Sequence, residues 1–208
     1  MYHALALLNT PHLKWLDWWS LANSIAMSKG ETLVSVTFCT APPKFKDGNV
    51  QRRHETYVQA LKARNVKVIG GYFLEGDVDC RKCNHSWKQP QEKEGDVNLA
   101  LSMIVDAYAD VYDSAYLVTA DGDQGPTISH LLTKFRTNLP VPKKAFVVVP
   151  PNMRPNRFLA SSAGAGNVVL TNKMMLQQNL LPQSLSFTTQ AGTQRNIYRP
   201  VEYDPPVP

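Results

Sequence analysis

Three aspartates could hold a cation close to one end of an expected strand. Asp121 and Asp123 flank a single glycine in the run YLVTADGDQGPTI, whose first residues are typical of a buried strand. Asp96 lies in the first turn of the helix expected to lead into that strand. Ligands of parallel α/β sheets bind beyond the carboxyl ends of the strands, where the following helices begin. We therefore expect the three carboxylates to meet at this edge of the sheet.

Clustered carboxylates repel one another unless a cation neutralises them. Hard oxygen ligands favour Mg²⁺ or Mn²⁺, and such an ion can polarise a phosphoryl oxygen and generate hydroxide from bound water. The structural alternative is that Asp123 caps a helix and Asp96 complements a helix dipole. Each residue alone favours that alternative, whereas the three together favour a metal site. Gly122 is expected to provide a backbone conformation that other residues resist.

Alternating helices and strands are expected to position these residues. The expected strands are 32–40, 66–70, 114–119, 144–149 and 167–171, and the expected helices are 12–29, 52–64, 96–111, a helix after Asp123 with Pro126 in its first turn, and 173–178. This order indicates an α/β three-layer fold with a mainly parallel sheet. The first element is a helix, although a doubly wound sheet normally starts with its central strand.

The polar stretch 76–90 is expected to be irregular. In the helix over 96–111, the spacing of apolar residues predicts one buried face. The expected face consists of Val97, Leu101, Ile104, Val105, Tyr108 and Val111. The tryptophans of 12–29 lie among leucines and are expected in the core. We expect one domain over 1–182, followed by a polar, proline-rich tail over 183–208.

The composition is that of an ordinary globular protein. The chain has 208 residues, 43% of them hydrophobic, and a net charge of +5. No apolar run reaches the length of a membrane helix, and no signal-peptide pattern opens the chain. The cysteines number only three, and this small, odd count argues against a disulfide framework and favours a reducing compartment. We therefore expect a cytoplasmic protein with no membrane association.

The charge is unevenly distributed. The segment 42–67 holds seven basic and two acidic residues, whereas 95–123 holds six aspartates and no lysine or arginine. A basic segment beside an acidic one suits a protein that binds a polyanion and holds a cation. Solvated helix faces are the alternative, and charge counts alone favour it.

The run CRKCNHSW offers Cys80, Cys83 and His85 as half of a zinc site. A structural zinc site needs four ligands, and no second pair stands nearby in the sequence. Cys39 or His54 could complete the set, but a tight polar loop is the favoured interpretation.

The segment EKEGDVNLALSMIVDAYADVYDSAYLVTADGDQGPTI resembles the signature of NYN-domain proteins of the PIN-like nuclease superfamily, including LabA-like proteins. The matching residues are Glu92-Lys93, Asp96-Val97-Asn98, and Asp121-Gly122-Asp123 followed by Pro126. VTFCTAPPK, VIGGYFLEGDVDCRKC and LLPQSL resemble the family's second strand, the stretch after its third strand and the domain's ending. The resemblance implies a Rossmann-like, PIN-like fold, a divalent-metal site and cleavage of RNA.

The chain departs from the family pattern at its beginning. The family starts with a strand that ends in Asp-Gly-x-Asn, and MYHAL resembles the residues immediately after that motif. We expect the first strand and its aspartate to lie upstream of Met1. The alternative is a truncated protein whose remaining aspartates bind metal weakly or not at all.

The residues and the resemblance support two hypotheses about function. In a metal-dependent ribonuclease, Asp96 and Asp121 would hold Mg²⁺ or Mn²⁺, Asp123 would hold the ion or orient water, and Asn98 would assist. RNA would be guided by four basic residues, namely Lys44, Lys46, Arg52 and Arg53. The alternative is a non-catalytic RNA-binding or protein-interaction module on the same scaffold. A homo-oligomer is compatible with either function.

Overall fold

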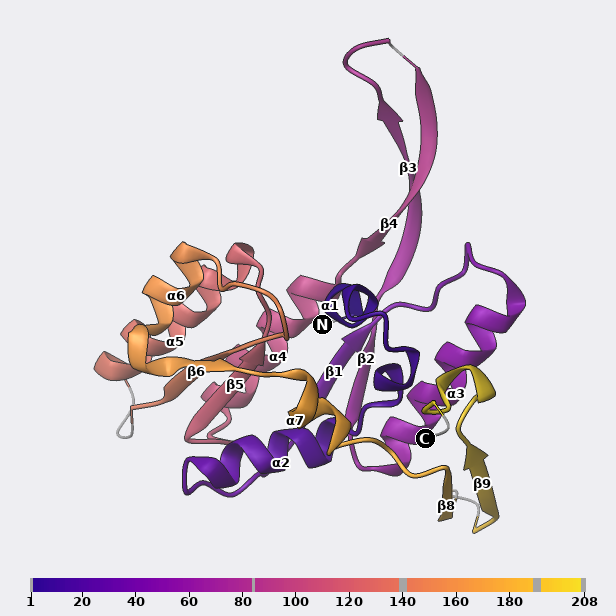
Figure 1. The fold of residues 1–208 in the computed structure, drawn as a ribbon. Coiled ribbons are helices and arrows are strands. Elements are labelled where there is room, and N and C mark those ends of the chain that lie inside the picture. The colour runs from indigo at the N-terminus through magenta and orange to yellow at the C-terminus, as the bar shows by residue number, and fades with distance from the viewer. Residues whose placement is uncertain (1, 84, 139–141, 189–191, 207–208) are drawn as a thin grey trace.

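The fold is a mixed arrangement of helices and small sheets. The computed structural model describes residues 2–83, 85–138, 142–188 and 192–206 (Figure 1). The described strands form four sheets, of which two are parallel and two are antiparallel. The α/β class expected from the sequence is therefore confirmed, but the parallel strands are divided between two sheets.

The first parallel sheet joins β1 (Thr37–Thr40) to β2 (Lys67–Gly70) through α3 (Gly48–Ala63). The carboxylate of Asp47 accepts hydrogen bonds from two backbone amides in the first turn of α3, which fixes the start of this helix. The strand expected over 32–40 is shorter than predicted. Glu31, just before that segment, binds two hydroxyl groups of β5, and the chain becomes a strand only at β1.

The second parallel sheet has the order β5 (Ser114–Val118), β6 (Lys144–Val149), β7 (Val168–Leu170). The last five residues of β6 are buried, as its nearly all-apolar sequence predicts for a strand covered on both faces. The strand predictions in this region are confirmed. Helices α5 (Gly125–Asn138) and α6 (Arg157–Ala163) lie beside this sheet, and α6 was not expected from the sequence (Figure 1).

The stretch expected to be irregular is a long antiparallel hairpin. Strands β3 (Tyr72–Asp79) and β4 (Ser86–Lys93) pair along their full length. Figure 1 shows the hairpin projecting far from the rest of the molecule. Pro90 lies within β4 and has no backbone N–H to donate. It is tolerated because both strands of a two-stranded hairpin are edge strands. The prediction over 76–90 is therefore wrong.

The helix expected over 12–29 is divided. A 3₁₀ helix, η1 (Pro11–Trp15), precedes α2 (Trp18–Ser28), and α1 (Tyr2–Leu7) lies before both. Leu16 forms an isolated bridge with Leu180, which keeps the chain extended between η1 and α2. As expected, Trp15 and Trp18 are buried.

The apolar face predicted for α4 (Gly95–Tyr108) is mostly on the wrong side. Ala107 is buried and three partly buried residues pack with it in one core cluster, namely Leu99, Met103 and Ile104. The exposed side chains are instead Val97, Leu101, Val105, Tyr108 and, just beyond the helix, Val111. Two apolar stripes run along this helix, and the spacing alone does not indicate which of them meets the sheet.

The expected C-terminal tail is structured in its described part. After α7 (Lys173–Gln177), strands β8 (Ser184–Thr188) and β9 (Gln194–Tyr198) form an antiparallel hairpin, followed by η4 (Val201–Tyr203). Ile197 of β9 is buried in the same apolar cluster as residues of α2 and α3. The prediction of a loosely held tail over 183–208 is wrong for these residues, because the hairpin contributes to the core.

One apolar cluster connects the two parallel sheets. Its buried members include Leu5 of α1 and Val148 of β6. Phe38 of β1 and Val118 of β5 also pack against it, one from each sheet. The two sheets therefore share a core, although they are not hydrogen-bonded to each other in the described part of the chain.

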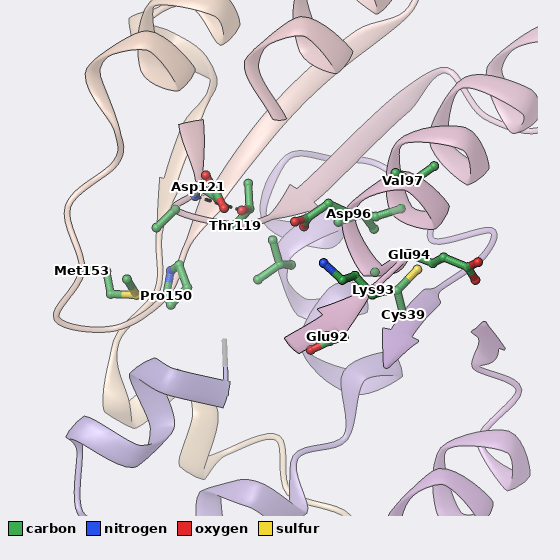
Figure 2. A pocket seen from close by; sticks show the side chains of 14 residues that line it. Cys39, Glu92, Lys93, Glu94, Asp96, Val97, Thr119, Asp121, Pro150 and Met153 are labelled. Carbon is green, nitrogen blue, oxygen red and sulfur yellow. Dashed lines mark hydrogen bonds between the residues drawn. The ribbon is translucent and has the colours of Figure 1, made fainter. Parts of the chain in front are cut away.

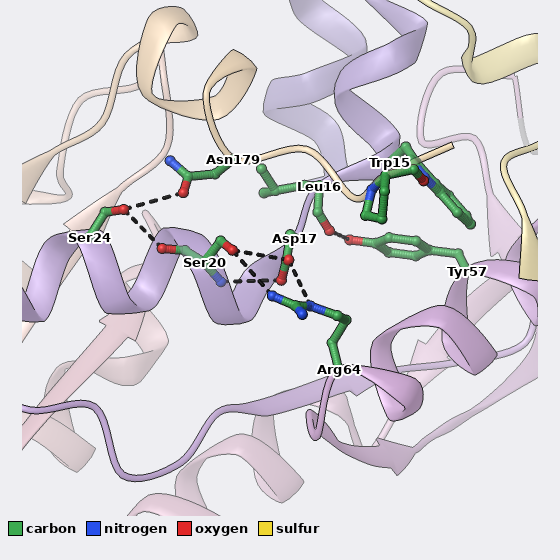
Figure 3. A network of polar contacts seen from close by, with 9 residues as sticks. Trp15, Leu16, Asp17, Ser20, Ser24, Tyr57, Arg64 and Asn179 are labelled. Atoms are coloured by element: carbon green, nitrogen blue, oxygen red, sulfur yellow. Dashed lines mark hydrogen bonds and ion pairs between the residues drawn. The ribbon is translucent and has the colours of Figure 1, made fainter. Parts of the chain in front are cut away.

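A polar network holds α2 against α3 (Figure 3). Asp17 is 2% exposed and caps α2 by accepting hydrogen bonds from the backbone amide and hydroxyl group of Ser20. Its carboxylate also accepts a hydrogen bond from Nε of Arg64 at 2.9 Å. Nearby, the Tyr57 hydroxyl donates to the carbonyl of Leu16 at 2.8 Å. The bonds from Ser20 and Arg64 provide partners for the buried carboxylate of Asp17 at the junction of the two helices.

Replacing Asp17 with alanine is expected to lower the free energy of unfolding by about 2 kcal/mol. The variant loses a helix cap and a charged hydrogen bond, but Arg64 has a side chain that is 38% exposed and regains water. Urea denaturation measures the change. Asp47→Ala is the matched control, because it removes the exposed cap of α3, and we expect a smaller loss. Equal losses of unfolding free energy in the two variants would contradict the expectation that the buried Asp17 contributes more than the exposed Asp47.

None of the helices in the described residues is long and apolar enough to span a membrane.

Candidate functional site

A pocket of about 750 Å³ opens where β1 and β5 end and α4 begins (Figure 2). Its walls come from β1, the end of β4, the first turn of α4 and the loops after β5 and β6. The residues that line it are Cys39, Glu92, Lys93, Glu94, Gly95, Asp96, Val97, Leu99, Val118, Thr119, Ala120, Asp121, Pro150 and Met153. The pocket thus lies at the carboxyl edge of the parallel strands, where the sequence predicted a site.

Two of the three predicted metal ligands, Asp96 and Asp121, line this pocket. Asp96 stands in the first turn of α4. Asp121 follows β5, and its backbone amide donates a hydrogen bond to the Thr119 hydroxyl at 3.0 Å. The Gln124 side chain donates to the backbone carbonyl of Asp96 at 3.2 Å, which ties the two walls together. The fold therefore brings these two carboxylates to one cavity.

The third predicted ligand, Asp123, is not among the pocket-lining residues. It lies in η2 (Gly122–Gln124), and its backbone amide donates to the carboxylate of Asp121 at 3.0 Å. The cap of this turn is therefore Asp121. Asn98 also lies outside the lining set, in the second turn of α4. No group of three or more His, Cys, Asp or Glu side chains in the described residues is arranged to hold a metal ion.

Glu92 is a pocket carboxylate that was not among the predicted ligands. It lies near the end of β4 at the pocket rim, and its Oε1 lies 3.0 Å from the position that a Cβ on Gly95 would occupy. Partial desolvation, reinforced by the negative charge of Asp96, raises the pKa of the Glu92 carboxyl group. The signal in the sequence was the Glu-Lys pair before Asp96, which is part of the family resemblance but carries no assigned role there.

Cys39 brings β1 to the same cavity. Burial raises the pKa of its thiol, the positive charge of Lys67 opposes this shift, and Asp96 and Glu92 add to it. These influences favour the neutral form of the thiol, which is a weaker nucleophile than the thiolate. The same electrostatic influence shows that the pocket concentrates negative charge beside β1.

Gly122 serves the turn in a different way from the one expected. Its φ angle is not positive, so the turn does not require the left-handed conformation. Instead, the side-chain nitrogen of Asn156 lies 2.7 Å from the position that a Cβ on Gly122 would occupy. Asn156 is held there as the cap of α6, accepting a hydrogen bond from the backbone amide of Phe158 at 2.8 Å. Glycine is needed for this close approach.

The predicted RNA-binding residues do not line the pocket. Arg53 forms an ion pair with Glu202 at 2.6 Å, and Arg52 donates to the side chain of Asn49 at 2.7 Å. Both arginines line a separate cavity of about 310 Å³ between α3 and η4. Lys44 and Lys46 are exposed on the loop that leaves the carboxyl end of β1, at the same edge as the pocket.

Strands β1 and β5 each have one edge without a strand partner in the described residues. β1 pairs with β2, and β5 pairs with β6. Residues at the carboxyl end of both strands line the pocket, Cys39 from one and Val118 from the other. All four residues of β1 are partly exposed, in contrast to the buried β6. The two unpaired edges therefore border the same cavity.

Comparisons with known proteins do not assign the chain to a family. No protein-family model matches the chain, and no curated protein matches it. A solved structure that resembles it is a protein of unknown function from Vibrio parahaemolyticus, with 18% sequence identity and a TM-score of 0.43. The match covers 82% of this chain and 81% of that one.

Proposed function

We propose that this protein is a divalent-metal-dependent ribonuclease that hydrolyses phosphodiester bonds of RNA. The observation that carries the proposal is the convergence of Asp96 and Asp121, with Glu92 at the rim, in one cavity at the carboxyl ends of β1 and β5. Such a cavity is where parallel α/β proteins bind ligands, and carboxylates that share a cavity favour a cation that neutralises them. The resemblance to NYN-domain proteins supports the same activity.

The donor set fits Mg²⁺ or Mn²⁺ held through few protein ligands. Mg²⁺ keeps several waters and is commonly bound by one or two carboxylates together with substrate phosphates. Asp96 and Asp121 would be those carboxylates, and this modest requirement is consistent with the lack of a three-residue ligand group in the described chain. When bound, the ion would supply polarisation of the phosphoryl oxygen and a more acidic water.

The remaining pocket residues would position the RNA backbone. Lys93 contributes a positive charge to the lining, and Lys44 and Lys46 extend that charge along the same edge of the sheet. Asp121 holds the turn after β5 in place through its bond to the Asp123 amide, and it lines the cavity beside Thr119 (Figure 2). Arg52 and Arg53 are engaged with other residues and are not needed in this arrangement.

We further propose that the two parallel sheets are parts of a PIN-like three-layer sandwich. One strand between β1 and β5 would give the order β2-β1-x-β5-β6-β7, with helices on both faces. The support is that both strands have an open edge at the pocket and that Phe38 and Val118 already share a core cluster. The carboxyl end of such a strand would enter the pocket beside Asp96 and Asp121.

Calorimetric titration of Mn²⁺ into the reduced protein tests the proposal. We expect one binding event with an affinity in the range of weak, water-rich carboxylate sites, and loss of that event in Asp121→Asn. Asp77→Asn is the matched control, because it removes the same charge from the exposed hairpin. Binding that persists in Asp121→Asn, or an absence of binding, would overturn the metal site. RNA binding without metal would then favour a non-catalytic module.

A further inference from the structure

The tip of the β3–β4 hairpin carries a cysteine pair away from the rest of the molecule. Figure 1 shows the tip at the far end of the projecting hairpin. All eight residues of β4 are exposed, and the residues of β3 are exposed or partly exposed. Cys80 and Cys83 lie in the turn between the strands, and both are free thiols. Cys83 is exposed and Cys80 is partly exposed, so a second molecule can approach this turn.

The two cysteines lie in one turn that is closed by a backbone hydrogen bond. Cys80 closes the hairpin by donating its backbone amide to the carbonyl of His85 at 2.8 Å. Two cysteines separated by two residues in one closed turn have the ligand spacing of structural zinc sites.

A single chain does not complete a zinc site at this tip. Structural zinc takes four ligands in tetrahedral geometry. His85 is the nearest further ligand in sequence, but its ring stacks on Trp87, with ring centroids 6.1 Å apart and planes at 17°. The described residues contain no group of three potential ligands, here or elsewhere. The tip thus offers half of the donors that zinc requires.

The surrounding charge suits a tetrathiolate centre. A zinc ion bound to four thiolates has a net charge of 2−, which nearby cations stabilise. Arg81 and Lys82 lie between the cysteines, whereas Lys88 of β4 is the register partner of Asp77 on β3 and Asp79 precedes Cys80. Two tips brought together would place both sets of cations around the centre. Without the metal the same cations would repel each other, so assembly is expected to depend on zinc.

We propose that two copies of this chain join at their hairpin tips by sharing one zinc ion, bound by Cys80 and Cys83 of each copy. The four thiols lose their protons on binding, so that each ion displaces four protons from the dithiol form. The symmetric arrangement uses the same surface of both copies, as expected for a two-fold dimer. The site is independent of the aspartate pocket and of the proposed ribonuclease activity.

Zinc titration of the full, reduced chain, followed by native mass spectrometry and light scattering, tests this proposal. We expect a dimer with one zinc ion per two chains and return to monomer after chelation. Co²⁺ used in place of zinc should give the intense thiolate-to-metal absorption of a tetrahedral four-sulfur site.

Matched variants separate this site from other zinc binding. Cys80→Ser and Cys83→Ser should each abolish the zinc-dependent dimer, whereas Cys39→Ser, in the partly buried β1, should retain it. His85→Gln should also retain it, because the ring is not a ligand. Far-ultraviolet circular dichroism checks that the variants fold. One zinc ion per monomer, loss of the dimer in His85→Gln, or no zinc binding would overturn the proposal.

Discussion

Replacing Asp96 with asparagine is expected to lower the rate of Mn²⁺-dependent RNA cleavage by about a hundredfold or more. Asparagine has nearly the same shape but no negative charge, so the pocket loses one of the two carboxylates proposed to hold the ion. Asp96 is at the start of α4 and its backbone carbonyl is held by Gln124, so the substitution leaves the fold intact. Single-turnover cleavage of a labelled RNA measures the effect.

The double variant Asp96→Asn/Asp121→Asn sharpens this prediction. Residues that act as a unit show strongly non-additive losses, so the double variant should be only slightly slower than either single variant. RNA binding, measured by fluorescence anisotropy without metal, should be unchanged. Asp77→Asn on the hairpin should cleave normally. Losses that multiply in the double variant would show that the two carboxylates act separately, which would contradict a shared ion.

Strands β5 and β6 could be predicted because their apolar composition indicates that they are buried. KAFVVV has five consecutive apolar residues, and such a run is stable only when both faces of the strand are covered. The strand before Asp121 was found in the same way. These two strands position half of the candidate site, so the place of Asp121 at the sheet edge could be predicted from local sequence alone.

The β3–β4 hairpin escaped prediction for the opposite reason. Strands β3 and β4 are solvent-exposed along most of their length, so their sequence shows little of the alternation that burial imposes. Their stability comes from cross-strand pairs such as Val78 with Trp87, which no single-strand pattern reveals. Glu92 was undervalued as a result, because only the hairpin returns it to the pocket.

The buried face of α4 shows a second limit of periodicity. Ile104 and Leu101 are both apolar and both fit a helical stripe, yet Ile104 packs in the core and Leu101 is 56% exposed. Which stripe is buried depends on how the helix is rotated over the sheet, and that rotation is a tertiary property. By contrast, the position of Asp96 in the first turn was insensitive to rotation and was predicted correctly.

A strand supplied between β1 and β5 is expected to raise both stability and metal affinity. The design fuses a five-residue apolar strand ending in Asp-Gly-x-Asn to the amino end of the chain. α1 is suited to receive it, because Leu5 packs in the cluster that Phe38 and Val118 contact from the two sheets. Pairing on both sides would satisfy the open edges of β1 and β5.

The two effects have different origins and can be separated. Burial of apolar strand residues should raise the free energy of unfolding by roughly 1.5–3 kcal/mol for each fully buried side chain, before the entropy cost of ordering the strand. An added carboxylate in the pocket should strengthen Mn²⁺ binding by about tenfold or more, because affinity rises with the number of charged ligands. Urea denaturation and calorimetry measure these changes independently.

The same fusion with asparagine in place of its aspartate is the decisive control. It should keep the gain in stability and lose the gain in Mn²⁺ affinity, since it fills the same edges without adding charge. A fusion that leaves stability unchanged would mean that β1 and β5 do not accept a strand, and the proposed single sheet would be wrong. A gain in stability without any gain in affinity would place the end of the new strand away from Asp96 and Asp121. The pocket would then be a poor candidate for metal-dependent cleavage, even with the sheet complete.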